Sequence, residues 1–253
     1  MLTFLKHIRL FYFFAFTILY SKNDIQFSAN VLENIVENDI EKRIFKDNVI
    51  IKKDDMILFT SEATYIPSEN KVLLNKNVEM YDQSDSLKCS NLILYDSEYK
   101  KFSASGNVMF YKKNQIIKSG NLKFVENLNM NSTIINLYDN AEIIDSNRVV
   151  LGDTLHIHYL DSLIHNIQII SNAKVFNYRS GKYNKNKKIQ KIEDSISSKK
   201  MFINFKDGDV REMRLSGMAE TNFNVIEDSL VTGLSASSGD SIYININDNI
   251  IKR

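Results

Sequence analysis

Apolar and polar residues alternate along most of this chain with a period of two. In the stretch Ser105 to Lys113, the alternation places Val108 and Phe110 on one face and Met109 and Tyr111 on the other. Roughly a dozen residues later a second alternating stretch runs from Ser119 to Phe124. This period is typical of β-strands, so we expect paired strands joined by turns.

The strand pair recurs along the sequence. An Asn followed by Val or Ala occurs at positions 48, 77, 107, 140 and 172, at steps of 29, 30, 33 and 32 residues, and Gly217-Met218-Ala219 is a degenerate copy. Asn and Gly tolerate positive φ, so a tight corner is expected at each copy. A fixed period of about 30 residues predicts a repeat architecture. The alternative is a generic all-β sandwich whose strands merely look alike.

The predicted fold class is all-β: two facing antiparallel sheets built from these repeats, which make an elongated sandwich or a folded β-trough. The opposite face of the strands carries polar residues such as Glu79, Lys123 and His156. The alternation assigns fifteen apolar residues to the inward face: Val49, Ile51, Ile57, Phe59, Val78, Met80, Leu92, Leu94, Val108, Phe110, Leu122, Phe124, Ile143, Leu155 and Ile157.

Two stretches depart from this rhythm. Residues 32–44 fit either an amphipathic helix or two strands joined by a turn at Asn34 to Asp39, and the repeat favours the strands. Residues 179–200 contain eight Lys or Arg and few apolar residues, which predicts a long exposed loop inserted in one repeat. Such a loop is either simply solvated, or a contact for an anionic headgroup through Lys185, Lys187 and Lys188.

The first 20 residues have the pattern of an export signal. Lys6 and Arg9 precede an apolar run of 11 residues from Leu10 to Tyr20, which is short for a membrane span. We therefore expect residues 1–20 to be a signal peptide or a short uncleaved anchor. Residues 21–253 are expected to form one domain.

The composition and the motifs argue against several classes of function. A net charge of +1 over 253 residues argues against nucleic acid as a partner. Cys89 is alone and cannot form an internal disulfide, and His156-x-His158 lacks a partner set for a metal. Without a catalytic motif, we expect neither an enzyme nor a cofactor. The apolar interior is then the one feature left that could bind a ligand. Burying a lipid chain there would contribute about 0.8 kcal/mol of binding free energy per methylene.

The repeated motifs resemble those of OstA-like proteins, over about residues 24 to 253. The motifs that carry this resemblance are Phe45-x-x-Asn48-Val49, Ser61-x-Ala63-x-Tyr65, Asn77-Val78, Asn91-Leu92-x-Leu94-Tyr95, Gly106-Asn107-Val108, Gly152-Asp153-Thr154-Leu155-His156-Ile157, Gly217-Met218-Ala219-Glu220-Thr221 and Gly239-Asp240-Ser241-Ile242-Tyr243-Ile244. Met218 stands where that family usually has Asn.

The resemblance implies a periplasmic bridge or carrier in lipopolysaccharide transport to the outer membrane. It implies a β-jellyroll whose groove holds the acyl chains of lipid A. It also implies partners among other envelope transport proteins, joined by edge-strand addition, and head-to-tail self-association. The main alternative is a structural or adhesive β-solenoid of the cell surface with a closed core. A carbohydrate-active β-helix enzyme would need a row of carboxylates across successive repeats, which the sequence lacks.

Overall fold

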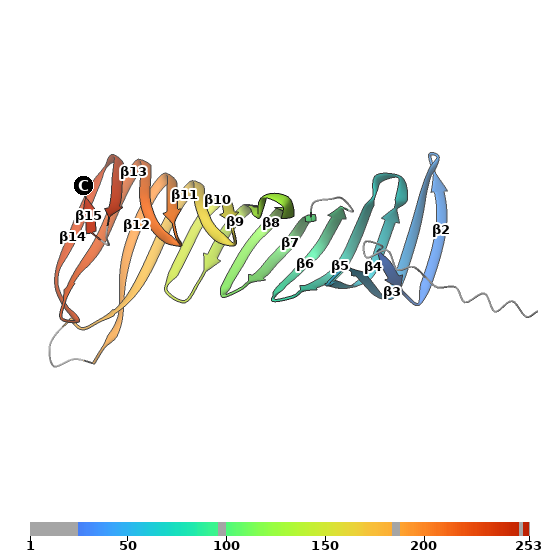
Figure 1. Cartoon of the computed structure of the whole chain (residues 1–253), viewed down its shortest axis with the longest axis horizontal. Coiled ribbons are helices and arrows are strands. Elements are labelled where there is room, and N and C mark those ends of the chain that lie inside the picture. Colours follow the sequence, from blue (N-terminus) through green and yellow to red (C-terminus); the bar gives the residue numbers. More distant parts are fainter. Residues whose placement is uncertain (1–24, 96–99, 184–187, 248–249, 253) are drawn as a thin grey trace, which may run out of the picture.

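The residues that the structure describes form one elongated antiparallel sheet of fifteen strands. The computed structural model describes residues 25–95, 100–183, 188–247 and 250–252. The strands follow one another in chain order from β3 to β15, and both β1 and β2 pair with β3 (Figure 1). The predicted signal segment, residues 1–20, lies outside the described residues. The all-β trough expected from the alternation is confirmed.

The strands lengthen toward the carboxyl end of the stack. Two short 3-10 helices, η1 (Pro67–Glu69) and η2 (Leu128–Met130), lie in turns. The strands are β1 (Gln26–Ser28), β2 (Val31–Glu37), β3 (Ile40–Lys53), β4 (Met56–Ile66), β5 (Lys71–Asp82), β6 (Asp85–Tyr95), β7 (Lys100–Lys112), β8 (Gln115–Asn127), β9 (Ser132–Ile144), β10 (Arg148–Leu160), β11 (Leu163–Gly181), β12 (Gln190–Lys206), β13 (Asp209–Glu227), β14 (Leu230–Asn247) and β15 (Ile250–Lys252).

The repeated Asn positions form bends in the middle of long strands, not turns that open new ones. At each bend two successive residues have φ between 50° and 78°, and the ladder to the neighbouring strand shifts register. The expected corners are thus confirmed, including the degenerate copy. The six pairs are Asp47–Asn48, Lys76–Asn77, Gly106–Asn107, Asp139–Asn140, Ser171–Asn172 and Gly217–Met218.

Gly106 shows why one bend needs glycine. Its φ is +78°, and a Cβ at this position would lie 2.6 Å from Ser90 Oγ and 2.7 Å from Ser90 Cβ. Any larger residue would therefore push the bends of β6 and β7 apart. Ser90 Oγ donates to the Gly106 carbonyl at 3.2 Å, which ties the two bends together.

The bends divide the sheet into two arms that face each other. The first arm ends in the turns that join β3 to β4, β5 to β6, β7 to β8 and β9 to β10. The second arm ends in the turns that join β4 to β5, β8 to β9, β10 to β11 and β12 to β13. In β7, for example, residues 100–105 belong to the second arm and residues 108–112 to the first. Inward side chains of both arms form one core cluster, so the folded sheet is a trough.

The strand alternative for residues 32–44 is confirmed, because β2 and β3 are joined at Asn38 and Asp39, both with positive φ.

The prediction of a long loop over residues 179–200 is wrong. Strand β11 continues to Gly181 and β12 starts at Gln190. Ile192, Asp194, Ile196 and Ser198 are buried in alternation, so this hairpin keeps a strand period that its Lys residues conceal. The described residues contain no helix long and apolar enough to cross a membrane.

Cys89 offers a test of this packing. It lies inward on β6, is 8% exposed, and burial raises its pKa from 9.0 to about 12, against backbone hydrogen bonds from Ser105 and Asn91. The unfolded thiol would ionise near pH 9, so only the unfolded state loses this proton between pH 9 and 12. The stabilisation that this difference in pKa gives the folded state is fully present below pH 9. Above it, we expect the free energy of unfolding to fall by up to about 1.4 kcal/mol per pH unit. Urea unfolding at several pH values measures this slope, and Cys89→Ala should remove it; an unchanged slope in the variant would contradict the assignment.

Candidate functional site

The interior of the trough is apolar over most of its length. Thirteen of the fifteen residues predicted to face inward are buried: Val49, Ile51, Val78, Met80, Leu92, Leu94, Val108, Phe110, Leu122, Phe124, Ile143, Leu155 and Ile157. They come from both arms and from successive strands between β3 and β10. Alternation alone therefore assigned most of these fifteen residues to the correct face.

The predicted phase of β4 is wrong. Phe59 is 41% exposed and forms an edge contact with Tyr81 on the outer face, and Ile57 is only partly buried. Met56 and Leu58 face inward instead. Four consecutive apolar residues begin this strand, so a period of two fits either face. The ladder decides, because Leu58 pairs with the inward residues Ile51 and Met80.

The middle of the trough is filled by its own side chains. The rings of Phe102 and Phe124 stack at 4.6 Å, and Phe110 meets both edge-on at 6.3 and 6.0 Å. Phe110 comes from the first arm, and the other two come from the second. All three are at most 3% exposed, so the arms touch here and leave no open space.

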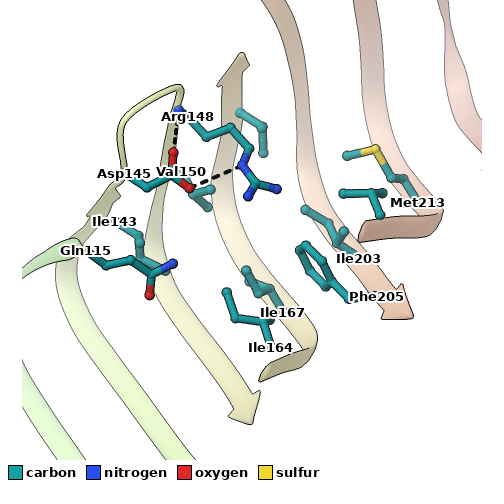
Figure 2. Close-up of a pocket in the computed structure, with 12 residues that line it drawn as sticks. Gln115, Ile143, Asp145, Arg148, Val150, Ile164, Ile167, Ile203, Phe205 and Met213 are labelled. Atoms are coloured by element: carbon teal, nitrogen blue, oxygen red, sulfur yellow. Dashed lines mark hydrogen bonds and ion pairs between the residues drawn. The ribbon is translucent and has the colours of Figure 1, made fainter. Parts of the chain in front are cut away.

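A hollow opens farther along, between β9 and β10 of the first arm and β11 to β13 of the second. Its cavity volume is about 50 Å³, and its mouth is open to solvent. Figure 2 shows aliphatic and aromatic side chains of both arms around it, with polar side chains on one side. The lining residues are Gln115, Ile143, Asp145, Arg148, Val150, Ile164, Ile167, Val175, Ile203, Phe205, Val210 and Met213.

The rim of the hollow is ordered by Asp145. Its Oδ1 accepts hydrogen bonds from the backbone N–H groups of Asn147 and Arg148 at 2.9 and 2.7 Å, which fixes the β9–β10 turn. Its Oδ2 accepts from Arg148 Nε at 3.2 Å. The guanidinium of Arg148 is thereby held beside the apolar lining (Figure 2). The hollow combines an apolar wall with one Asp145–Arg148 ion pair at its rim, so the lining itself suits an apolar chain.

Only Ile143 among the lining residues was in the predicted inward set. The sequence prediction stopped at Ile157, although alternation continues in β11, where Ile167, Ile169 and Val175 are buried. Extending the period through β11 to β13 would have identified most of the apolar wall. Gln115, Asp145 and Arg148 lie in or beside turns and gave no such signal.

The other predicted contacts lie elsewhere. Lys185 and Lys187 are outside the described residues, and Lys188 is exposed beside the β11–β12 turn. His156 Nδ1 lies 2.6 Å from Asn136 Oδ1, and His158 Nε2 lies 2.9 Å from Ser132 Oγ, so both rings have local partners on the outer face. Among the described residues no group of three His, Cys, Asp or Glu could hold a metal ion.

Comparison with models of known protein families and with curated proteins gave no match to this chain. The resemblance to OstA-like proteins thus stays an expectation from the motifs. The geometry itself supports one kind of chemistry, which is the burial of an apolar chain between the two arms.

Proposed function

We propose that this protein binds the acyl chains of an envelope lipid between its two arms and carries or relays that lipid across the periplasm. The observation that carries the proposal is the apolar hollow that opens between β9–β10 and β11–β13. Each buried methylene contributes about 0.8 kcal/mol, so an acyl chain that enters between the arms there needs no specific polar motif to bind. The motif resemblance and the export-like first 20 residues support lipopolysaccharide as the lipid.

A tryptophan in the hollow tests this proposal directly. Ile164 lines the hollow and is partly buried, whereas its neighbour Leu163 is 50% exposed outside it. Ile164→Trp should fill the space and weaken binding of lipid A that carries a fluorescent acyl chain by tenfold or more. Leu163→Trp should change the affinity less than twofold. The measurement is a fluorescence titration of each purified protein.

The same two variants report on where the lipid binds. The natural chain has no Trp, so each variant has a single indole fluorophore. Residual lipid binding should shift the emission of Trp at position 164 to the blue and leave that at position 163 unchanged. Equal affinities and equal spectra in the two variants would show that lipid does not occupy the hollow.

A closed structural or adhesive solenoid is the second candidate, and the aromatic packing of Phe102, Phe110 and Phe124 favours it. If the whole trough behaves like this section, neither the natural protein nor either variant will bind lipid A. The titration therefore separates the two candidates.

Assembly with further copies or with other envelope proteins belongs to the proposal as well. Strand β2 pairs with β3 on one edge, and all seven of its residues are exposed, including Leu32 at 56% and Val36 at 74%. An edge strand with apolar side chains is a template for strand addition.

A further inference from the structure

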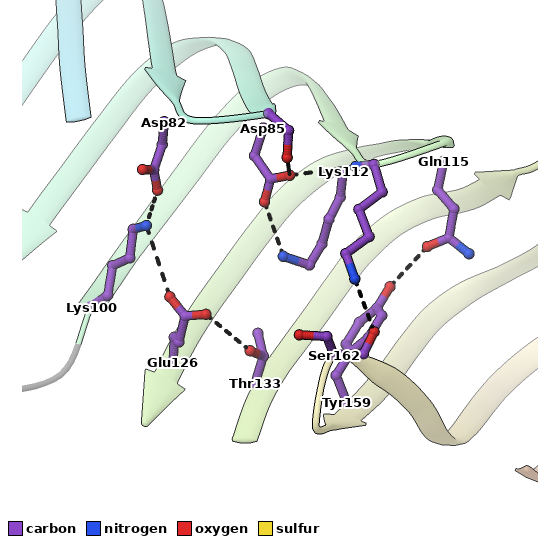
Figure 3. Close-up of polar contacts among 11 residues, drawn as sticks. Asp82, Asp85, Lys100, Lys112, Gln115, Glu126, Thr133, Tyr159 and Ser162 are labelled. Atoms are coloured by element: carbon purple, nitrogen blue, oxygen red, sulfur yellow. Dashed lines mark hydrogen bonds and ion pairs between the residues drawn. The ribbon is translucent and has the colours of Figure 1, made fainter. Parts of the chain in front are cut away.

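Polar contacts join the two arms across the mouth of the trough beside the hollow. The Asp82 carboxylate at the end of β5 forms an ion pair with Lys100 at the start of β7 (Figure 3). Asp82 lies on the first arm and Lys100 on the second. Lys100 Nζ also lies 3.8 Å from Glu126, which accepts a hydrogen bond from Thr133 at 3.5 Å. This bridge spans β5 to β9.

A second set of contacts crosses between the β7–β8 turn and the end of β10. The Tyr159 hydroxyl donates to Gln115 Oε1 at 3.0 Å, and Lys113 Nζ donates to the Ser162 carbonyl at 3.2 Å. Lys112 forms an ion pair with Asp85 at 3.0 Å, and its Nζ lies 5.8 Å from the centre of the Tyr159 ring (Figure 3). The links to Tyr159 and Ser162 bring residues of opposite arms together, although their strands are not neighbours in the sheet. The Lys112–Asp85 pair lies within the first arm, between the neighbouring strands β6 and β7.

Burial makes these contacts mutually dependent. The side chain of Lys100 is 29% exposed, and burial lowers its pKa, while the Glu126 carboxylate opposes that shift. Burial also raises the pKa of Tyr159, aided by the Asp85 carboxylate, so its hydroxyl remains a donor to Gln115. Pairing of charges that are partly desolvated in this way adds little net stability. The contacts therefore hold the two arms together with only a small free energy.

The contacts end where the hollow begins. Gln115 accepts from Tyr159 on one side and lines the hollow on the other. Toward β5, the interior behind the contacts is packed by Phe102, Phe110 and Phe124. Toward β13, the wall consists of Ile164, Phe205 and other residues of the lining. Gln115 thus marks the boundary between the section of the mouth that polar contacts cross and the section that opens into the hollow.

We propose that the Asp82–Lys100, Gln115–Tyr159 and Lys113–Ser162 contacts form a latch that closes the trough from β5 to β10, so that an acyl chain enters through the hollow beside Gln115. This inference assumes the proposed lipid binding and adds where the chain enters and which residues exclude it elsewhere. Opening the latch extends the apolar groove toward β5. The latch therefore sets how much acyl chain the protein can accept.

The single cysteine of the chain reports on the latch without any lipid. Cys89 lies inside the latched section, 8% exposed, and should react slowly with a thiol reagent. The double substitution Lys100→Ala with Tyr159→Phe removes two of the cross-arm links. Lys118→Ala is the matched control, because Lys118 pairs with Glu142 at 3.0 Å within the first arm. Urea unfolding of each protein establishes that labelling occurs from the folded state.

We expect the double variant to label at Cys89 at least tenfold faster than the natural protein, and Lys118→Ala within twofold of it. Fluorescent lipid A should then bind the double variant more tightly or in greater stoichiometry. Unchanged labelling would overturn the latch. Faster labelling with unchanged lipid binding would overturn its role in admitting the chain. If no protein binds lipid A, the proposed function fails, while the labelling rates still decide whether the arms are latched.

Discussion

Replacing Phe110 with Ala is expected to lower the free energy of unfolding by about 3–5 kcal/mol. Phe110 is 1% exposed and contacts Phe102 and Phe124 from the opposite arm, so its removal leaves a cavity at the centre of the trough. The bends fix the positions of both arms, which limits how far they can collapse into that cavity. Equilibrium unfolding in urea measures the loss.

Phe59→Ala is the matched control for this prediction. The chemical change is the same, but Phe59 is 41% exposed on the outer face and meets only the edge of Tyr81. Its loss should cost about 1 kcal/mol or less. A larger effect for Phe59 than for Phe110 would reverse the assignment of inner and outer faces. It would restore the sequence-based phase of β4.

This packing changes the meaning of the predicted lipid-contact residues. Phe110 and Phe124 were expected to line a groove, and they do face the interior, but they fill it with their own rings. A lipid could reach them only after the arms separate. In the closed arrangement, the residues open to an acyl chain are those of the hollow, chiefly Ile164, Phe205 and Val210.

The repeat itself was visible in the sequence because each copy has a local cause. Asn or Gly at a bend allows positive φ, and alternation follows from the geometry of a strand, so both leave a signal within a few residues. Even the copy with Met218, whose φ is 53°, was found through the neighbouring residues Gly217 and Ala219. These two local signals were enough to predict an all-β fold of repeated strand pairs, as either a sandwich or a folded trough.

Features that depend on contacts between distant residues could not be predicted in this way. The hollow is lined by residues that lie far apart in the chain, from Gln115 to Met213, so no short stretch of sequence signals it. The β11–β12 hairpin was misassigned because polar residues occupy inward positions there. Asp194 is 3% exposed, yet the partners that permit its burial lie 15 and 30 residues away in the chain.

Replacing this buried carboxylate, in Asp194→Ala, is expected to lower the free energy of unfolding by about 3–5 kcal/mol. Asp194 accepts from Arg179 Nε and Nη2 at 2.8 and 3.0 Å, and from the backbone N–H of Asn224 at 2.7 Å. It therefore ties β11, β12 and β13 together. Without it, the Asn224 N–H loses its acceptor, the guanidinium keeps only its bond to the Asn224 carbonyl at 2.6 Å among those described, and a small cavity remains.

Two further variants distinguish the effect of losing the Arg179–Asp194 ion pair from the effect of losing side-chain volume at position 194. Asp153→Ala removes a carboxylate that accepts only from the Asn172 side chain on the exposed side of a bend, and it should cost about 1 kcal/mol or less. Arg179→Met combined with Asp194→Leu removes both charges and keeps apolar volume, so it should recover part of the stability lost in Asp194→Ala. Urea unfolding of the four proteins compares them directly. A double variant that is less stable than Asp194→Ala would mean that the ion pair contributes little, and that the packing of the β11–β12 hairpin depends on the shape of these two side chains instead.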